Sequence, residues 1–535
     1  MSSIKLLDCT VRDGGYLNDW KFGSCVLTET VQRLINANVD YVELGFIDDR
    51  RYYDENKSIF PNTKTISETY KHVKPNNKTK FVAMIDYGTC DIKNIQKQAD
   101  TILYGIRVIF KKEKMNEALA YCKQIKDLGY AVFTQLVSTT AYEKEDFTKL
   151  ISLENELMPM CVSIVDTYGL MDFDELESIF EVLDAGLDKN ISIGFHAHNN
   201  LQFAFSNTIQ FASISSDRAR VIDGTLMGMG KSAGNAPIEL VANYCNNKLG
   251  LEFNINELLE GVDSNIMKLF GRNNWGYSMK FLLSSINRVH PNYVNDYISK
   301  DSLSISDLND CLKRISEDKK LLYDKNESES NFNSYCSNRF DDKENVEHFS
   351  SIIGGKKVLL LGPGTSVEAA RDKIQLFIEN ENPIIISINY LSKIRPNYVF
   401  ISNSRRLGYL ANDFEKIYAC DAKVIATSNL TPYFKKFDLV FNFQWLIDTT
   451  SFAKDSAMIM ILKLLEKCQC KNVFLAGFDG YASSFADDFV NISNSHGWKE
   501  PYPGFLNSYI RGQIKQYREN MNVIFLTSSL FEEED

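Results

Sequence analysis

The sequence FHAHNN, residues 195–200, places His196 and His198 two positions apart at the end of a predicted strand. Side chains at positions i and i+2 of a strand lie on the same face of a sheet, so both imidazoles point the same way. The segment DCTVRDGGY, residues 8–16, follows another predicted strand and supplies a carboxylate at Asp13. Two imidazoles and one carboxylate suit a catalytic divalent metal with open coordination positions. Two histidines at this spacing also occur as ordinary core or surface residues, but Asp13 favours the metal.

Two further charged residues and a glycine-rich segment accompany these candidate ligands. Arg12 precedes Asp13, and a buried arginine there can stabilise negative charge that develops on a substrate oxygen. Glu43 can hold the guanidinium by a bidentate pair, although an ion pair with a purely structural role fits both residues as well. The segment GTLMGMGKSAGNAPIE, residues 224–239, can close over a site or turn backbone N–H groups toward an anion, and its Asn235 can reach the metal. Flexibility alone would give the same composition.

These residues need a scaffold that brings the ends of strands together. Eight short apolar runs predict buried strands, and amphipathic stretches such as 116–129 and 173–187 predict helices between them. The predicted strands are 4–10, 41–47, 80–86, 105–111, 130–136, 161–167, 191–197 and 220–226. Eight such units predict a (β/α)8 TIM barrel of the α/β class, whose active site lies at the C-terminal ends of the strands. Other polar residues predicted at those ends are Asp48, Arg107, Gln135, Asp166 and Asp223.

The pattern changes after the barrel. We expect the barrel over 1–252, a helical extension of it over 253–323, a polar linker over 324–351 and a second α/β domain over 352–535. The last domain opens with KKVLLLGPGTS, residues 356–366. Further strands are predicted at 383–389, 397–402, 423–428, 438–443, 472–478 and 522–528. Helical stretches between several of these strands predict a doubly wound open sheet.

Composition excludes several classes of partner. A net charge of -11 over 535 residues argues against nucleic acid. No apolar run reaches the roughly 18 residues of a membrane helix, so we expect no membrane partner. The 11 cysteines form no CxxC pair, which indicates reduced thiols and a cytoplasmic protein. We also expect a homo-oligomer.

Four segments in this order resemble the DRE-TIM metallolyase superfamily, and within it the 4-hydroxy-2-oxovalerate aldolase type. They are DCTVRDGGY, VELGF, GFHAHNN and GMGKSAGNAPIE. The resemblance covers about residues 3–300. It implies a divalent metal, Mn²⁺ in the first place with Mg²⁺ or Co²⁺ as alternatives, bound by Asp13, His196 and His198 with Asn235 nearby. It further implies that Arg12, held by Glu43, stabilises a pyruvate enolate formed from a small 2-oxo acid, with an aldehyde as the other reactant. The implied substrate-binding residues are Gly14, Gly15, Arg107, Gln135 and Asp166.

The sequence departs from that aldolase type at Tyr16, where the relatives carry a histidine base. A phenol has an ordinary pKa near 10, so Tyr16 acts as a base only if its pKa is depressed, and otherwise donates a hydrogen bond or lines the pocket. A CoA-dependent Claisen synthase or lyase is one alternative. However, Gly15 and Tyr16 replace the acidic residue and glutamine of the synthases, and the loop 224–239 lacks the cysteine of the lyases. An inactive barrel that serves as a scaffold is the other alternative.

The second domain resembles, through LLLGPGTSVEAA and NVFLAGFDGY, the Rossmann-like modules of pterin-pyrophosphokinase-like and sialyltransferase-like proteins. The resemblance implies a nucleotide or nucleotide-sugar site, and for the whole chain a role in sugar biosynthesis for surface polysaccharides. The residues that would line this site are Gly362, Gly364, Ser366, Asn389, Asn403 and Asp479. A docking or oligomerisation domain is the alternative, because the glycine turn is not a full GxGxxG.

Overall fold

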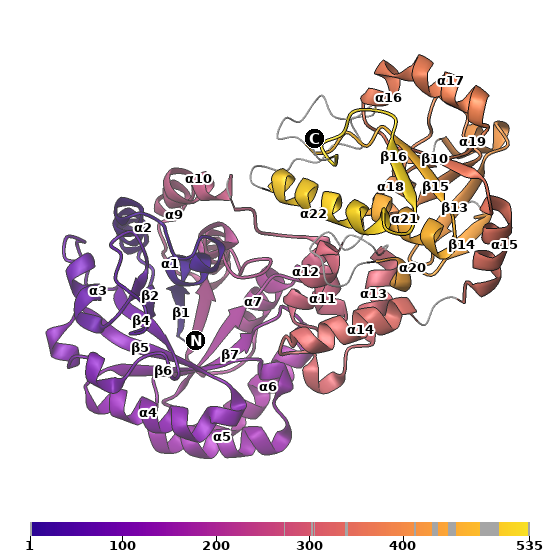
Figure 1. The fold of residues 1–535 in the computed structure, drawn as a ribbon. Helices are drawn as coiled ribbons and strands as arrows, with labels where there is room; N and C mark the ends of the chain where they lie inside the picture. Colours follow the sequence, from indigo (N-terminus) through magenta and orange to yellow (C-terminus); the bar gives the residue numbers. More distant parts are fainter. Residues whose placement is uncertain are drawn as a thin grey trace. The chain divides into compact units, whose positions relative to one another are not determined.

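The computed structural model describes residues 3–271, 273–300, 303, 305–337, 341–410, 413–430, 437–447, 456–481 and 502–532. The chain divides into two compact units, Met1–Pro291 and Asn292–Asp535. Figure 1 shows a barrel in the first unit and an open sheet in the second. Each unit is described by itself.

Eight parallel strands close into a barrel in the first unit, in the order β1-β9-β8-β7-β6-β5-β4-β2 with β1 paired again to β2. The strands are β1 (Ile4–Asp8), β2 (Tyr41–Ile47), β4 (Lys80–Asp86), β5 (Leu103–Phe110), β6 (Ala131–Leu136), β7 (Cys161–Asp166), β8 (Ser192–Ala197) and β9 (Arg220–Gly224). A two-residue strand, β3 (Ile59–Phe60), pairs outside β2. All eight predicted strands are confirmed, and so is the TIM barrel. Only β9 separates β1 from β8, which brings the ends of these three strands together.

Helices follow most of the strands and cover the outside of the barrel. They are α2 (Ser24–Asn36), α3 (Thr63–Thr69), α4 (Met115–Asp127), α5 (Lys144–Leu157), α6 (Phe173–Gly186), α7 (Ala204–Ser213) and α8 (Ile238–Leu249). Helix α6 begins at a capping box, in which the side chain of Asp172 accepts from the N–H of Glu175 and the side chain of Glu175 accepts from the N–H of Asp172. Between β4 and β5 there are two short 3₁₀ turns, Ile92–Asn94 and Gln98–Asp100, where an ideal repeat would have a helix.

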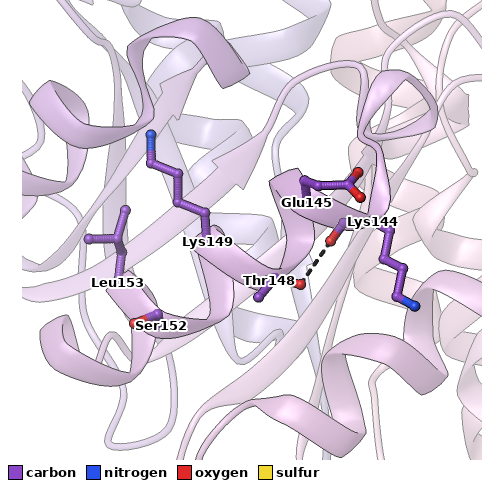
Figure 2. Close-up of a pocket in the computed structure, with 6 residues that line it drawn as sticks. All are labelled: Lys144, Glu145, Thr148, Lys149, Ser152 and Leu153. Atoms are coloured by element: carbon purple, nitrogen blue, oxygen red, sulfur yellow. Dashed lines mark hydrogen bonds between the residues drawn. The ribbon is translucent and has the colours of Figure 1, made fainter.

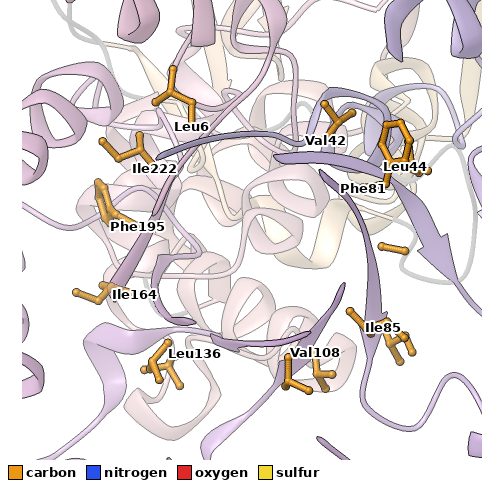
Figure 3. Packing of buried hydrophobic residues seen from close by; sticks show 14 of the residues in the cluster. Leu6, Val42, Leu44, Phe81, Ile85, Val108, Leu136, Ile164, Phe195 and Ile222 are labelled. Atoms are coloured by element: carbon orange, nitrogen blue, oxygen red, sulfur yellow. The ribbon is translucent and has the colours of Figure 1, made fainter. Parts of the chain in front are cut away.

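The main core lies between the strands and the surrounding helices. Figure 3 shows outward-facing strand residues of this layer, among them Leu6, Val108 and Phe195, all fully buried. Alternate residues point into the barrel, where Tyr41 packs edge-on against Phe133 with ring centres 5.4 Å apart. Since each strand is buried on both faces, the sequence shows mostly apolar runs rather than alternation.

A buried carboxyl group, Glu154, interrupts the apolar face of α5. It is fully buried, and neither of its oxygens accepts a hydrogen bond of acceptable geometry from a described residue. Burial raises the pKa of Glu154 to about 8, and the hydroxyl of Thr134 offsets this only in part. Because the pKa in the folded state lies above the ordinary 4.5, the protonated form favours folding. That contribution is complete below the ordinary pKa and is lost as the pH rises toward the folded-state value.

Replacing Glu154 with methionine is therefore expected to stabilise the protein far more at about pH 8 than at about pH 5, by a few kcal/mol, because an apolar residue has no charge to desolvate. Urea unfolding of both proteins at the two pH values measures the difference. The matched control is Glu156→Met, since Glu156 is exposed on the same helix. An unchanged pH dependence in Glu154→Met would contradict the assignment.

Helices α9 (Ile255–Gly261), α10 (Met267–Phe270) and α11 (Met279–Ile286) complete the first unit, and α12 (Pro291–Ser299) and α13 (Ile305–Lys313) begin the second. The predicted boundary of the helical extension at 323 therefore differs from the observed division after Pro291. The polar linker predicted over 324–351 is wrong, because the segment contains α14 (Lys325–Ser337) and most of α15 (Lys343–Ile353).

The polar residues of that segment are in contact with the second sheet, which explains the error. The carboxylate of Asp342 accepts from the indole N–H of Trp445 at 2.7 Å, and Asn345 donates to the carbonyl of Val440 at 2.8 Å. Phe349 is fully buried, with its ring 5.7 Å from that of Phe441. A helix that is anchored by polar caps and one aromatic residue looks like a linker when only composition is considered.

The second unit contains a parallel sheet in the order β14-β13-β12-β11-β10-β15-β16. Its strands are β10 (Lys357–Leu361), β11 (Ile384–Ile388), β12 (Tyr398–Ile401), β13 (Lys423–Thr427), β14 (Leu439–Phe441), β15 (Asn472–Ala476) and β16 (Asn522–Phe525). All seven lie at predicted positions, and the α/β class of this region is confirmed. The chain winds outward from β10 to β14 and then returns to the other side of β10, so the strand order reverses between β10 and β15. In the described part of the chain, no helix has the length and apolar character to span a membrane.

Candidate metal and substrate site

The carboxyl ends of β1, β8 and β9 bring together the three predicted metal ligands. Asp13 ends the single-turn helix α1 (Thr10–Asp13) after β1, His196 lies in β8 and His198 just beyond it. All three side chains are buried, and one ligand atom from each lies within 4.8 Å of the others. The Nε2 atom of His196 is 3.9 Å from Oδ2 of Asp13, and the two imidazole rings are 5.1 Å apart. The structure therefore juxtaposes the residues that the spacing of FHAHNN suggested.

A carboxylate behind His196 orients its ring. Oδ2 of Asp223, in β9, lies 2.9 Å from Nδ1 of His196. Such a partner makes Nδ1 the protonated nitrogen and leaves the lone pair on Nε2, which faces Asp13. Burial raises the pKa of Asp223, but the charges of Arg107 and His196 lower it further, so it stays ionised. This is the arrangement that metal-binding histidines need.

The glycine-rich segment after β9 packs against the same cluster. The amide of Asn235 donates to Oδ2 of Asp13 at 2.5 Å, and Asn235 pairs with His198 in an isolated antiparallel bridge. A Cβ on Gly230 would lie 2.7 Å from Oδ2 of Asp13, so only glycine lets the backbone approach so closely. The segment is held by hydrogen bonds such as that from the N–H of Asn199 to the carbonyl of Gly234 at 2.8 Å.

Arg12 is buried between two carboxylates. Its Nη1 lies 2.7 Å from Oδ1 of Asp13, its Nε lies 2.7 Å from Oε2 of Glu43, and its guanidinium stacks over Phe46 at 5.6 Å. Both predicted roles of Arg12, the enolate clamp and the structural ion pair, use these contacts.

Arg107 and Gln135, predicted to bind substrate, lie in a buried polar network. Arg107 forms ion pairs with Asp223 and, at 3.2 Å, with Glu43, and it donates to Oε1 of Gln135 at 2.9 Å. The amide of Gln135 in turn donates to Ser163 at 2.9 Å. These groups hold Glu43 and Asp223 in place, although Nε of Arg107, Oε1 of Glu43 and Oδ1 of Asp223 have no hydrogen-bond partner among the described residues.

Asp166, also predicted to bind substrate, caps the loop that follows β7. Its carboxylate accepts from the N–H groups of Leu170 at 2.9 Å and Met171 at 3.3 Å. Burial raises the pKa of Asp166 to about 7, although these hydrogen bonds oppose the rise. Its contacts are thus with the protein's own backbone.

The protein's own side chains fill the space beside Gly14 and Gly15, the two glycines implied to bind substrate. A Cβ on Gly14 would lie 2.9 Å from the sulfur of Met229, and a Cβ on Gly15 would overlap the indole ring of Trp20. The indole N–H of Trp20 also donates to the carbonyl of Arg12 at 2.7 Å. Both glycines therefore permit close packing of the segment that carries Arg12 and Asp13.

Tyr16 lies at the edge of the site, with 42% of its surface exposed. Its ring packs edge-on against Trp20 at 4.8 Å and lies 5.4 Å from the ammonium of Lys231. Burial of the phenol group raises the pKa of Tyr16 to about 12, and the charge of Arg12 opposes this only in part. A phenol with this pKa keeps its proton at neutral pH, so it can donate a hydrogen bond. The sequence pattern did not indicate a role for Lys231, because the segment 224–239 stood out for its glycines.

The charges and donor atoms of the cluster fit a divalent cation. Burial raises the pKa of Asp13, but Arg12, His198 and His196 lower it much further, so the carboxylate is ionised. Burial lowers the pKa of His198 to about 3, which leaves the imidazole neutral. Buried Nδ1 of His198 and Oδ1 of Asn235 have no hydrogen-bond partner among the described residues. One carboxylate and two imidazoles with unshared electron pairs are a donor set for such an ion.

A second cluster, Cys9 with His196 and Asp223, is the other group of ligand type in the described part of the chain. Burial raises the pKa of the Cys9 thiol well above its ordinary value, so it stays protonated. Asp223 is already engaged by Arg107 and His196. The cluster of Asp13, His196 and His198 is therefore the better metal site.

Comparison with known proteins places this site in a family. Residues 3–260 match the family model described as HMGL-like. The N-terminal region is an HMGL-like domain of the DRE-TIM type.

Several relatives of this HMGL-like domain have curated names. Oxaloacetate decarboxylase of Mycobacterium tuberculosis is 25% identical over 248 residues, 44% of this chain and 67% of the relative. The 4-hydroxy-2-oxovalerate aldolase of Roseiflexus sp. is 24% identical over 246 residues, 45% of this chain and 70% of the relative. That of Pelotomaculum thermopropionicum is 28% identical over 241 residues, 44% of this chain and 68% of the relative. Among solved structures, HMG-CoA lyase of Bacillus subtilis matches with a TM-score of 0.40 at 15% identity, covering 52% of this chain and 96% of the other.

Outside the HMGL-like domain, four of the six predicted nucleotide-site residues meet where the strand order reverses. Gly362 and Gly364 follow β10 and lie against the backbone of Gly477 and the carboxylate of Asp479, which follow β15. That carboxylate accepts from the N–H of Ser366 at 2.9 Å. Open α/β sheets bind ligands at this kind of reversal. The N–H of Ser366 is thus engaged by Asp479.

The other two residues, Asn389 and Asn403, follow β11 and β12. The side chain of Asn389 accepts from the N–H of Ser402 at 3.4 Å, and that of Asn403 accepts from the N–H of Arg406 at 3.4 Å. The first contact links the loops after β11 and β12, and the second lies within the turn that follows β12. Binding of a nucleotide or nucleotide sugar in this domain stays a prediction.

A pocket on the outside of the HMGL-like domain offers no competing site. Figure 2 shows its six lining residues, which all belong to α5: Lys144, Glu145, Thr148, Lys149, Ser152 and Leu153. The hydroxyl of Thr148 donates to the carbonyl of Lys144 at 2.9 Å, a contact within the helix. A depression on the surface of one helix does not converge polar groups on a ligand.

Proposed function

We propose that the HMGL-like domain is a divalent-metal-dependent lyase that makes or breaks a carbon–carbon bond between a pyruvate-type enolate and an aldehyde. The observation that carries the proposal is the buried cluster of Asp13, His196 and His198 with the Arg12 guanidinium 2.7 Å from Asp13. The family match and the relatives named as aldolases support it. We propose Mn²⁺ as the metal, with Mg²⁺ and Co²⁺ as alternatives, and a small 2-oxo acid as substrate.

Each residue of the site has its own role in this reaction. A divalent metal bound by Asp13, His196 and His198, with Asn235 beside them, would act as a Lewis acid on the keto group of the 2-oxo acid. The guanidinium of Arg12 donates hydrogen bonds to the oxygen on which the enolate charge develops. Glu43 fixes Arg12, and Asp223 fixes the ring of His196. In the direction of synthesis the enolate carbon bonds to the aldehyde carbon, and the aldehyde oxygen takes up a proton.

Tyr16 is a donor in this scheme. Because burial raises its pKa to about 12, the phenol keeps its proton at neutral pH and can hydrogen-bond the aldehyde oxygen. In the direction of cleavage, the proton of the C4 hydroxyl must therefore go to another acceptor, such as water. This is the step at which the chain differs most from relatives that carry a histidine base.

The protonated state of Tyr16 favours a second candidate, decarboxylation of oxaloacetate. This is the activity named for the Mycobacterium tuberculosis relative. Loss of CO₂ breaks the C3–C4 bond, leaves the electron pair on the pyruvate enolate and removes no proton from a hydroxyl. A neutral Tyr16 does not impede that reaction. The two candidates share the enolate, Arg12 and the metal, and they differ only in the group that leaves.

Exchange of the C3 protons of pyruvate in deuterated buffer tests the shared step, because it requires the enolate and no second substrate. We expect exchange with Mn²⁺ and its loss after chelation with EDTA. Consumption of oxaloacetate, compared with condensation of pyruvate and an aldehyde, then separates the two candidates. No exchange with Mn²⁺, Mg²⁺ or Co²⁺ would contradict the proposal and favour the scaffold alternative. Release of free thiol from acetyl-CoA would instead favour the Claisen synthase.

A further inference from the structure

Lys231 is the one cation in the segment 224–239, and the proposed chemistry does not use it. Its ammonium lies over the ring of Tyr16, 5.4 Å from the ring centre. The side chain is half-buried, and burial lowers its pKa, with the charge of Asp13 partly offsetting this. An ammonium removed from water in this way is unfavourable unless an anion accompanies it.

The described part of the protein supplies no such anion at contact distance. Among the ion pairs formed by the described residues, none includes Lys231, and Asp13 and Asp86 act on it only through longer-range charge. The oxygens of Asp13 are already engaged by Arg12 and Asn235. The ammonium therefore has hydrogen-bonding capacity left for a ligand.

The backbone holds Lys231 beside the reacting groups. The preceding residue, Gly230, lies against Oδ2 of Asp13, and the N–H of Gly234 donates to the carbonyl of Lys231 at 3.0 Å. The next residue, Ser232, has a left-handed backbone with φ of 60°, so the chain turns sharply there. The ammonium thus lies beside Tyr16, the proposed donor to the aldehyde oxygen, and its charge acts on Asp13 and His198 of the candidate metal cluster.

We propose that Lys231 binds an anionic group on the aldehyde partner, so that the substrate class is an aldehyde with a carboxylate or a phosphate. The inference rests on the proposed function, because it concerns the second reactant of that site. The metal cluster and Arg12 serve the 2-oxo acid, whereas Lys231 stands over Tyr16 where the aldehyde is bound. A charge-assisted hydrogen bond from the ammonium would select a charged aldehyde over its neutral counterpart.

Matched pairs of aldehydes test the inference with the Mn²⁺-loaded full chain. Condensation with pyruvate is measured for glyoxylate against acetaldehyde, and for glyceraldehyde 3-phosphate against glyceraldehyde. For the preferred anion we expect kcat/KM to exceed that of the neutral partner by about tenfold or more, as one charge-assisted contact allows. Lys231→Met should lower that ratio by about tenfold, and Lys231→Arg should retain part of it. The pair that responds identifies the anion as carboxylate or phosphate.

The control is Lys149→Met, on the outer face of α5, which should leave both ratios unchanged. Thermal unfolding of each variant verifies the fold. A ratio that is the same in wild type and Lys231→Met overturns the inference while the proposed function stands. Absence of pyruvate exchange in the wild type overturns the proposed function, and this inference with it.

Discussion

Replacing Asp13 with asparagine is expected to lower Mn²⁺ affinity by about a hundredfold or more, and to reduce metal-dependent pyruvate exchange at least as much. The substitution keeps the shape of the side chain but removes the one carboxylate of the donor set. It also removes the anion beside Arg12, so the cluster has one negative charge fewer to balance the charge of the metal. Isothermal titration with Mn²⁺ and the exchange rate in deuterated buffer measure the two effects.

Two controls make this result interpretable. Cys9→Ala removes a member of the competing cluster and should leave Mn²⁺ affinity within about twofold, because a protonated thiol is a poor ligand. Asp127→Asn, on the surface of α4, should change nothing. Loss of Mn²⁺ affinity in Cys9→Ala together with its retention in Asp13→Asn would contradict the assignment of the metal site.

Stability must be measured beside activity. Asp13→Asn leaves the buried guanidinium of Arg12 with Glu43 as its remaining carboxylate partner, and removing one member of a buried ion pair costs about 3–5 kcal/mol in known cases. Urea unfolding of the metal-free variant therefore has to show a folded protein at the assay temperature. A folded variant without Mn²⁺ affinity is the informative outcome.

The barrel could be predicted from the sequence because its strands are buried on both faces. Mostly apolar runs such as 41–47 and 161–166 stand out against the amphipathic helices, and a count of eight allows few other folds. The closure of β1 onto β9 then determines that Asp13 meets His196, without any knowledge of side-chain positions. The metal cluster was accessible because it depends on strand order alone.

Features that depend on side-chain packing could not be predicted in this way. The space beside Gly15 is filled by Trp20, five residues later, and sequence spacing does not show which way that ring turns. Arg107, predicted to face a substrate, turns toward Glu43 and Asp223, because three buried charges are most stable when they satisfy one another. Lys231 became significant only once the structure showed its ammonium over Tyr16 without an ion-pair partner among the described residues.

The error at 324–351 has a different cause. Composition reports the average polarity of a segment, whereas a helix needs only a few anchors, here Phe349 and the carboxylate of Asp342. A polar residue that forms a cap or a hydrogen bond stabilises the helix. The same residue makes the composition of the segment more polar, and a polar composition is typical of a linker. A count of amphipathic positions around Phe349 would have been the better signal.

Replacing Arg12 with methionine is expected to slow pyruvate exchange by about 10²–10³-fold, as removal of one oxyanion-stabilising donor does elsewhere. Mn²⁺ affinity should change much less, because Arg12 is not a ligand. Arg12→Lys should not restore the rate, since a lysine ammonium cannot contact Asp13 and Glu43 through two separate N–H groups and still donate to an enolate. The exchange rate at saturating Mn²⁺ and pyruvate is the measurement, and Arg50→Met, an exposed arginine near the barrel mouth, is the control.

Glu43→Gln then separates the two roles that the sequence left open for Arg12. If Arg12 is the enolate clamp, loosening it through Glu43 should lower kcat of the folded fraction moderately at normal Mn²⁺ affinity, beside the loss of stability that removal of a buried ion-pair partner causes. If Arg12 only braces the barrel mouth, both Arg12→Met and Glu43→Gln should lower the free energy of unfolding while the folded fraction exchanges pyruvate at the wild-type rate. Arg12 and Arg107 both contact Oε2 of Glu43, so one substitution weakens the ion pairs of both guanidiniums. Arg107→Lys is the control for the guanidinium of Arg107, because it loosens the same carboxylate without altering Arg12 itself. An exchange rate that falls only in Arg12→Met and Glu43→Gln identifies Arg12 as the group that acts on the enolate.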